Sequence, residues 1–478
     1  MCGICGIVEL GAPPAEAVVA RMSACLTHRG PDGDGLFAAE GVALGHRRLA
    51  IIDTSAAGHQ PFASDDGQLQ LVHNGEVYDY RELRTELEAK GHRFRSGTDT
   101  EVILRAYEEW GDACVERFNG MWAFVLWDGR RQRLLCARDR FGVKPFLYRW
   151  DGRRLVFASE PAAFRADPAA HLRPDLQAVR DFVGLGATDH TDGTFFEGIR
   201  RLPAAHTLVV DASGLRLRRY WALEPRPVDG DPVVAFRETF LDAVRLRLRS
   251  DVPVGTALSG GLDSSAIAVA IDHLLRTEAE SARPVGDRQR TFTAWFPDHG
   301  FDERPFAEAV ASAILSEPHW VTFSDADLVD VLPRVVECQG EPFGSTSIVA
   351  QWHVMRAARD AGITVMLDGQ GGDEVLAGYP MTFGYRFADL LTTGRLPALW
   401  RELAVYRRRH GASAAATALA TPFLPAPLRQ RLRERRLAGV GLLGPAVAGL
   451  AVTPQPRPRE GLPDRLRRQY STILLDRG

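Results

Sequence analysis

The pattern of apolar residues changes where Pro225, Pro227 and Pro232 crowd together with Gly230, and this change constrains the fold more than any other feature of the chain. Before it, short apolar runs are separated by Gly, Asp and Asn turn clusters, which is typical of β-strands. After it, short strands alternate with helices, which predicts right-handed crossovers and a parallel sheet. Because 478 residues exceed what one hydrophobic core can hold, we expect two or three domains of different architecture.

The hydrophobic period also places individual strands and helices approximately. In the first half, strands are predicted around 69–73, 122–127 and 133–137, and helices near 15–26 and 80–90. Apolar residues at every fourth position from Phe236 to Leu248 predict a helix. Beyond it we expect strands at 252–258, 291–296, 319–323 and 363–367, and helices from Ser264, Glu303 and Ser347. Ligands are expected at the carboxyl ends of these strands.

Composition excludes some classes of function. A net charge of −3 gives no reason to expect nucleic acid. The sequence has no run of about 18 apolar residues, and its N-terminus lacks a basic segment followed by an apolar one. No membrane partner is therefore expected, and the protein is predicted to be cytoplasmic. Six loosely spaced cysteines in a large chain predict free thiols. The arginine-rich stretch after residue 395 is interpreted as solvated helix faces, because no aromatic residues interleave with the charges.

Cys2 directly follows the initiator methionine. Removal of Met1 would leave a thiol and an α-amine on the same residue. An α-amine has an unperturbed pKa near ~8, so near neutral pH a useful fraction is free to accept the thiol proton. Cys2 is therefore the candidate nucleophile for cleavage of an amide. The alternative, that Cys2 and Cys5 form half a zinc site or a redox pair, is weaker because the chain has no second such pair.

A second motif, Ser259-Gly260-Gly261-Leu262-Asp263-Ser264-Ser265, lies between a predicted strand and a predicted helix. Its glycines let backbone N–H groups approach phosphate oxygens, its serines add hydroxyl donors, and the helix N-terminus favours negative charge. It lacks the lysine of a Walker A loop. The motif therefore indicates a pyrophosphate clamp, with Asp263 as a magnesium ligand. A similar loop, Asp368-Gly369-Gln370-Gly371-Gly372-Asp373-Glu374, follows a later strand, where Asp373 could supply a second carboxylate.

A third group of polar residues belongs to the first half. His73-Asn74-Gly75-Glu76 is predicted to end a strand, where the Asn74 side chain and the Gly75 N–H could form an oxyanion hole. Arg48 could clamp an α-carboxylate, while Glu76 and Asp99 could hold an α-ammonium. Taken singly, each of these residues is more readily explained as a turn or a surface ion pair.

Jointly, the motifs resemble those of glutamine-dependent asparagine synthetases over nearly the whole chain. The resemblance rests on Met1-Cys2-Gly3-Ile4, His28-Arg29-Gly30-Pro31-Asp32, Arg48-Leu49-Ala50-Ile51-Ile52-Asp53, Asn74-Gly75-Glu76, Gly97-Thr98-Asp99-Thr100-Glu101, residues 138–145, Ala158-Ser159-Glu160 and the two glycine loops. It implies an α+β N-terminal-nucleophile domain, an αββα sandwich, followed by an α/β parallel-sheet ATP-pyrophosphatase domain. The implied divisions are a glutaminase domain over 2–210, a linker over 211–235, a synthetase domain over 236–395 and a helical, Arg- and Ala-rich extension over 396–478.

The resemblance also implies roles for individual residues. Cys2 would attack the glutamine amide, and glutamine would be bound by Arg48, Asn74, Gly75, Glu76 and Asp99, with Asn74 and Gly75 stabilising the oxyanion. Ammonia would pass through an internal tunnel. ATP would be bound at Leu258, Ser259, Gly260, Gly261, Asp263, Ser264, Ala294, Asp368 and Gly369, with magnesium at Asp263 and Asp373. Aspartate would be adenylated, ammonia would then displace AMP, and the resemblance implies a homodimer.

The chain departs from the family at two places. The position of Gln370 is often acidic in the family, and glutamine cannot act as a carboxylate. No lysine follows Lys144, whereas the family carries one for the acyl-adenylate chemistry in a later helical segment. Arginine cannot replace it as a proton-transfer group, because it stays protonated. Four interpretations remain open: an asparagine synthetase, a relative that amidates another carboxylate, a glutaminase with an impaired synthetase half, and a non-catalytic chain that binds glutamine, nucleotide or a partner chain.

Overall fold

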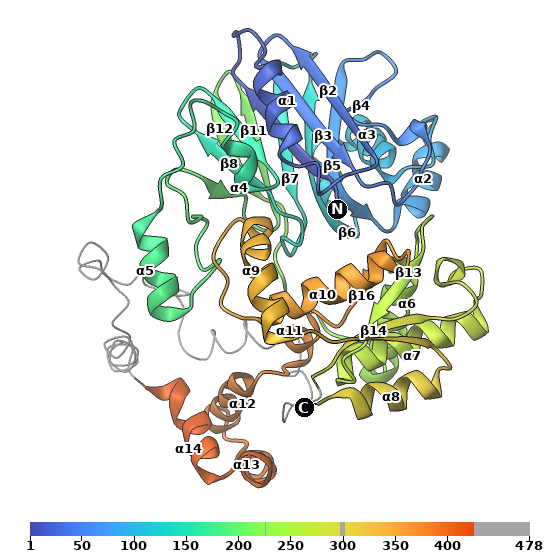
Figure 1. Ribbon diagram of the computed structural model, residues 1–478, viewed down its shortest axis with the longest axis vertical. Helices are drawn as coiled ribbons and strands as arrows, with labels where there is room; N and C mark the ends of the chain where they lie inside the picture. The colour runs from blue at the N-terminus through green and yellow to red at the C-terminus, as the bar shows by residue number, and fades with distance from the viewer. Residues whose placement is uncertain (225, 297–301, 425–478) are drawn as a thin grey trace.

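The computed structural model describes residues 1–224, 226–296 and 302–424. Two antiparallel sheets form the first half, and a parallel sheet flanked by helices forms the second (Figure 1). This confirms the predicted fold class. Within the described ranges, no helix combines the length and apolar character needed to span a bilayer. Most of the predicted 396–478 extension lies outside these ranges, including the arginines between 429 and 436.

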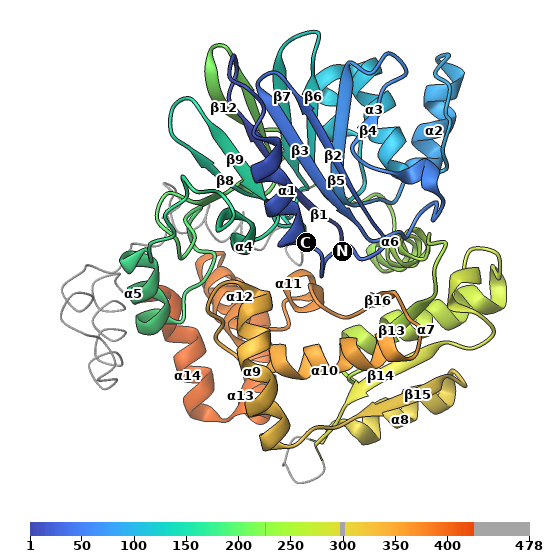
Figure 2. The same ribbon diagram turned by 45° about the horizontal axis from the view of Figure 1, so that its top comes forward.

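The two sheets of the first half each contain six strands. The first sheet has the order β10-β8-β9-β1-β3-β2, from β1 (Gly3–Val8), β2 (Gly33–Ala39), β3 (Val42–Arg48), β8 (Leu147–Trp150), β9 (Leu155–Ala158) and β10 (Arg200–Arg201). The second has the order β12-β11-β7-β6-β5-β4, from β4 (Phe62–Ala63), β5 (Leu69–Val77), β6 (Gly120–Asp128), β7 (Arg133–Arg138), β11 (His206–Asp211) and β12 (Gly214–Arg219). The N-terminus lies on the side of this half that faces the second half (Figures 1 and 2).

The main core of this half lies between the two sheets. Ile4 and Leu44 of the first sheet share a buried cluster with Val72 and Val125 of the second. Helices α1 (Glu16–Ala24) and α4 (Pro161–Phe164) pack on the outer face of the first sheet, whereas α2 (Tyr80–Ala89) and α3 (Asp99–Trp110) cover the second. A further helix, α5 (Leu176–Leu185), follows. The result is the predicted sandwich of two sheets between two layers of helices.

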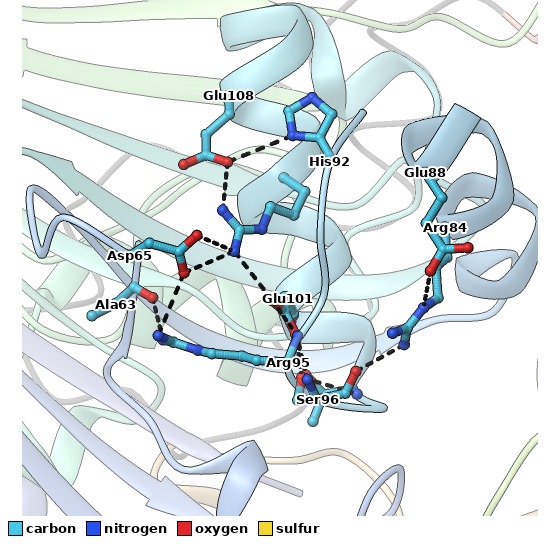
Figure 3. Close-up of polar contacts among 11 residues, drawn as sticks. Ala63, Asp65, Arg84, Glu88, His92, Arg95, Ser96, Glu101 and Glu108 are labelled. Carbon is cyan, nitrogen blue, oxygen red and sulfur yellow. Dashed lines mark hydrogen bonds and ion pairs between the residues drawn. The ribbon is translucent and has the colours of Figure 1, made fainter. Parts of the chain in front are cut away.

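Helix α3 was not predicted from the hydrophobic period. Its sequence nevertheless has a helical period, because Ile103, Tyr107 and Trp110 share one face and Glu101, Arg105 and Glu108 the opposite one, and residues 99–107 are all buried. Its first turn is specified by polar contacts: the Thr98 hydroxyl accepts a hydrogen bond from the Glu101 N–H, and the buried Glu101 carboxylate accepts from Ser96 N–H and Oγ (Figure 3). Arg105 bridges Glu101 to Asp65 in the same network. These contacts fix the helix end that carries Asp99.

The second half has a four-stranded parallel sheet in the order β15-β14-β13-β16. Its strands are β13 (Val254–Ala257), β14 (Arg290–Ala294), β15 (Glu317–Val321) and β16 (Val365–Leu367), all within a few residues of the predicted positions. One face is covered by α6 (Pro232–Arg247), α7 (Leu262–Thr277) and α8 (Arg304–Ala313), and the other by α10 (Ser347–Asp360), against which α9 (Asp325–Gln339) packs. Burial on both faces is expected of a parallel sheet.

Helix α9 was missed between the predicted strand 319–323 and the predicted helix at Ser347. It begins at a reciprocal capping box between Ser324 and Asp327, a local signal that could have located it. The last described helices are α11 (Gly372–Leu376), α12 (Pro380–Thr392), α13 (Leu396–His410) and α14 (Ala412–Ala420), of which α12, α13 and α14 share a small core. Residues 407–409 lie exposed on the last turn of α13, as predicted for a solvated face. All six cysteines are free.

The core between the sheets yields a stability prediction. Phe157 is 0% exposed and stacks on Phe146 with ring centroids 5.6 Å apart. We expect Phe157→Ala to lower the free energy of unfolding of the first half by about 3–5 kcal/mol, because the substitution leaves a cavity. Urea denaturation followed by tryptophan fluorescence would measure this change. The matched control Phe141→Ala removes a side chain that is 70% exposed, so a comparable loss in both variants would contradict the prediction.

Candidate active site

Cys2 lies directly before the central strand β1 and beside the loop that follows β3. Its thiol is within 3.6 Å of the Leu49 carbonyl, and the Leu49 N–H lies 3.4 Å from the sulfur. Arg29 Nε donates to the Cys2 carbonyl at 2.8 Å, and the Arg29 guanidinium pairs with Glu160 at 2.6 Å. His28 bonds the same carboxylate from a half-exposed position, in keeping with a supporting role. Cys2 is thus held from two loops.

Cys2 lines a small pocket. The lining also includes the predicted residues Arg48, Gly75, Glu76 and Asp99. Together with Cys2, these residues come from four separate motifs, which the structure brings to one place. Sequence reasoning did not single out the other lining residues, which are Leu49, Ile51, Ile52, Gly58, Gln60, His73, Thr98 and Thr100. Apolar residues with a few convergent polar groups are typical of a small-molecule site.

Asn74 is 0% exposed, and neither its amide nitrogen nor its amide oxygen has a hydrogen-bond partner in the protein. Leaving a buried polar group unpaired costs about 1–3 kcal/mol, so such a group needs an explanation. The predicted strand end is slightly wrong here, because β5 continues through Asn74 to Val77. Asn74 is therefore held rigidly by the sheet; it does not itself line the pocket, although its neighbours His73 and Gly75 do.

Two carboxyl groups, those of Glu76 and Asp99, are buried close together in the cavity wall. Burial, followed by the proximity of Asp99, raises the pKa of Glu76 well above its ordinary value, and one of its carboxylate oxygens has no partner. Burial likewise raises the pKa of Asp99 to about 7, although its carboxylate accepts a hydrogen bond from the Val77 N–H at 2.8 Å. A cationic group placed between them would stabilise both charges.

Arg48 is turned toward the loop that follows it. Its guanidinium donates to the Ser55 carbonyl at 2.6 Å and to the Asp53 carbonyl. Gly58 packs so closely that a Cβ atom there would lie 2.1 Å from the guanidinium. The guanidinium carries five N–H donors, so donors remain for an anion in the cavity.

Lys144 is a buried cation that the residue-level reasoning did not identify. Its side chain is 4% exposed, and its Nζ lies 3.2 Å from the Met1 sulfur. Burial lowers the pKa of this ammonium, with Glu76 acting in the opposite direction. Burial also lowers the pKa of the Met1 α-amine to about 6 and raises that of the Cys2 thiol. The only signal in the sequence was the position of Lys144 within the motif at 138–145.

The second predicted site surrounds the turn between β13 and α7. The hydroxyls of Ser259 and Ser264 lie 3.0 Å apart, and Ser259 Oγ accepts from the Gly261 N–H at 3.2 Å. Gly260 has φ +82°, and a Cβ there would lie 2.6 Å from the Ala307 nitrogen, so only glycine fits. The first N–H groups of α7 have no acceptors within the helix and remain available to phosphate oxygens.

The remaining predicted nucleotide-binding residues lie at the same sheet edge. Leu258, Ala294 and Asp368 occur at or just after the carboxyl ends of β13, β14 and β16, which are neighbours in the sheet. Gly369 packs against the Asp263 side chain, since a Cβ there would lie 3.2 Å from the Asp263 Cβ. Gln370 is exposed, and its N–H donates to Asp368 at 3.0 Å, so its contribution here is a backbone turn.

Asp263 and Asp373 approach each other from the two glycine loops. The carboxylate of Asp263 packs on Gly372, where a Cβ would lie 2.4 Å from its Cγ. Burial, then Asp373 and Glu374, raise the pKa of Asp263. Among the described residues, no group of three or more His, Cys, Asp and Glu side chains forms a metal cage. Two carboxylates still suit Mg²⁺, which is commonly held by one or two carboxylates together with substrate phosphates and water.

Comparisons with known proteins identify the families to which the two halves of the chain belong. Residues 1–221 match the family described as glutamine amidotransferase domain, and residues 235–476 match the family described as asparagine synthase. The chain belongs to the family of glutamine-hydrolysing asparagine synthetases.

Individual relatives are similar over most of this chain. Asparagine synthetase [glutamine-hydrolyzing] 3 of Bacillus subtilis is 37% identical over 80% of this chain and 63% of its own length. Asparagine synthetase [glutamine-hydrolyzing] 1 of the same organism is 31% identical over 79% of this chain and 59% of its own length. Asparagine synthetase [glutamine-hydrolyzing] 2 of Arabidopsis thaliana is 34% identical over 79% and 61%. The chain thus spans about six-tenths of the length of these relatives.

The geometry at Gly75 yields a second prediction. Gly75 has φ +149°, and a Cβ there would lie 2.1 Å from the Met121 carbonyl oxygen on the neighbouring strand. We expect Gly75→Ala to force β5 and β6 apart, lowering the unfolding midpoint and weakening glutamine binding in calorimetry. Gly67→Ala is the matched control, since Gly67 has φ +71° but no atom within 4 Å of a Cβ. Equal effects of the two substitutions would contradict the steric argument.

Proposed function

We propose that this protein converts aspartate to asparagine, using ammonia released from glutamine and energy from ATP. The observation that carries the proposal is the pocket that Cys2 lines together with Arg48, Glu76 and Asp99, next to the strand in which the buried Asn74 amide has no partner. An amide donor is what an oxyanion needs, and paired carboxylates are what an α-ammonium needs. The family match to asparagine synthase supports the second half of the reaction.

The glutaminase step would use Cys2 as its nucleophile. Once Met1 is removed, the α-amine of Cys2 accepts the thiol proton, and the sulfur attacks the amide carbon of glutamine. The resulting oxyanion accepts hydrogen bonds from Asn74 Nδ2 and the Gly75 N–H. Ammonia leaves with the proton, and water then hydrolyses the thioester to glutamate.

Glutamine would be oriented by charge at its other end. Glu76 and Asp99 would hold the α-ammonium, while Arg48 would hold the α-carboxylate. The buried carboxyls have raised pKa values and an unpartnered oxygen, so a bound ammonium supplies the counter-charge that the protein lacks. This arrangement supports an amino acid as the substrate rather than a simple amide.

The synthetase step would occur at the edge of the parallel sheet. Ser259, Gly260, Gly261 and Ser264 would bind the phosphates, and the backbone near Leu258, Ala294, Asp368 and Gly369 would hold the adenosine. A magnesium ion held by Asp263 and Asp373 would neutralise phosphate charge. The β-carboxylate of aspartate attacks the α-phosphorus and releases pyrophosphate. Ammonia then attacks the acyl carbon of the β-aspartyl adenylate and releases AMP.

Cys2→Ala tests the division of labour between the two sites. With glutamine, aspartate and MgATP, we expect the wild-type protein to form glutamate, AMP and asparagine together. Cys2→Ala should lose glutamine-dependent asparagine by at least about 10³-fold, because no nucleophile remains. It should keep asparagine formation from added ammonia. Mass spectrometry of the three products would measure both activities.

Asp263→Asn provides the reciprocal control. It should lose asparagine formation from either nitrogen source while still releasing glutamate, because it removes a charge only from the nucleotide site. Glutamate release alone from the wild-type protein would instead indicate a glutaminase without synthesis. Asparagine formation by Cys2→Ala from glutamine would contradict the assignment of Cys2.

The raised pKa of Asp99, about 7, predicts a pH dependence. A carboxyl with a raised pKa is neutral below that value, and a neutral acid cannot balance an α-ammonium. We expect kcat/KM for glutamine hydrolysis to fall about tenfold between pH 8 and pH 6, since this parameter reports ionisation of the free enzyme. In Asp99→Asn, kcat/KM should be lower at every pH, and its fall between pH 8 and pH 6 should disappear. An unchanged fall in the variant would exclude Asp99 as the group responsible for it.

A further inference from the structure

The segment 247–251 runs from the last residue of α6 toward the start of β13. It contacts the first half of the chain next to the pocket that Cys2 lines. Figures 1 and 2 place α6 in the second half, on the side facing the first. The Asp251 carboxylate accepts a hydrogen bond from the Asp53 N–H at 2.7 Å, and the Asp251 N–H donates to the Ile51 carbonyl at 2.9 Å. Two reciprocal bonds thus join Asp251 to one short loop.

That loop holds several parts of the cavity wall together. Asp53 adopts a left-handed backbone conformation, φ +52°, which is uncommon for a residue other than glycine. Its carbonyl accepts a hydrogen bond from Arg48, and its carboxylate accepts from the Gly97 N–H at 2.6 Å, just before the helix that begins at Asp99. Ile51 and Ile52 line the cavity directly. Asp53 therefore links Arg48 to the start of the helix that carries Asp99. These two residues are expected to hold the α-carboxylate and the α-ammonium of glutamine.

The same segment, 247–251, contacts the first half of the chain at a second place. The Arg249 guanidinium donates to the Tyr78 carbonyl at 2.6 Å and to the Glu82 carboxylate at 2.6 Å. Arg247 lies over the Tyr78 ring, 5.0 Å from its centroid. Tyr78 follows directly after the strand that carries Asn74, Gly75 and Glu76. Contacts from one segment of the second half therefore reach the loop after β3 and the end of β5.

We propose that Asp251 is a positioning residue for glutamine: it holds the loop at 51–55, and through it Arg48, from the synthetase half. The inference rests on the proposed function, because it assigns Arg48 to the substrate carboxylate. Asp251 touches neither substrate nor Cys2 and acts through the loop. Asp53 would otherwise have to keep its left-handed conformation with its N–H unpaired. Glutamine affinity therefore depends on a residue outside the glutaminase fold.

Glutamine kinetics of Asp251→Ala test the inference on the full-length protein. We expect KM for glutamine to rise about tenfold with kcat within twofold, because the hydrogen bond to a charged acceptor that orders the loop is lost. Asparagine formation from added ammonia should be unchanged. Asp251→Asn keeps an oxygen acceptor for the Asp53 N–H and should restore KM to within threefold. If Asp251→Ala does not fold, Asp251→Ser, whose side chain is shorter, takes its place.

Asp242→Ala is the matched control, because Asp242 lies on α6 and pairs with Arg245 of the same helix. Hydrogen exchange of the amides at 51–55 should accelerate in Asp251→Ala and not in this control. Unchanged KM and unchanged exchange in Asp251→Ala would overturn the inference.

Glutamine binding separates this inference from the proposed function. In a Cys2→Ala background, calorimetry should show the glutamine Kd weakened about tenfold by Asp251→Ala. If the wild-type protein hydrolyses no glutamine but this Kd shift is found, the proposed function fails and the positioning role stands. If the Cys2→Ala protein binds no glutamine, or binds it equally with and without Asp251, the positioning role is overturned.

Discussion

The pairing of β1 on both of its edges is the constraint on which the glutaminase site depends. β1 is hydrogen-bonded to β3 over the whole of Gly3–Val8 and to β9 over its second part. A strand in the middle of a sheet cannot shift its register without disrupting two ladders and turning its side chains to the wrong face. Cys2 lies one residue before this strand, so a chain terminus, usually the loosest part of a protein, has a defined position.

Around this fixed nucleophile the protein gathers charges that it does not fully compensate. Asp99 and Lys144 are buried and Glu76 is half-buried, and desolvation disfavours the charged form of each. In an ordinary core such groups would be paired or replaced by apolar residues. Glu76 and Asp99 line the same pocket as Cys2. A zwitterion such as the proposed glutamine would supply an ammonium as a counter-charge to these carboxyls.

Much of this arrangement could be predicted from local sequence. The change of pattern near Pro232 separates the two architectures, and the glycine loops at Gly260 and Gly371 mark the edge of the parallel sheet. Helix α3 was missed although its sequence has a helical period, whereas the burial of its polar side chains Glu101 and Arg105 in an ion-pair network is not visible in the sequence. The bond between Asp53 and Asp251 was equally hidden, since it joins positions 198 residues apart and neither has a local pattern that requires the other. The resemblance named the motifs but not the contacts between them.

The short strand β13 has a consequence for how this chain can vary in length. Asp251, which accepts a hydrogen bond from the loop at 51–55, lies shortly before this strand. Ser259, in the turn proposed to bind phosphate, lies shortly after it. Its neighbours β14 and β16 fix its register on both sides. An inserted or deleted residue between these ends would turn the strand's side chains over or displace one of the two loops. Among homologues, this stretch should therefore keep its length.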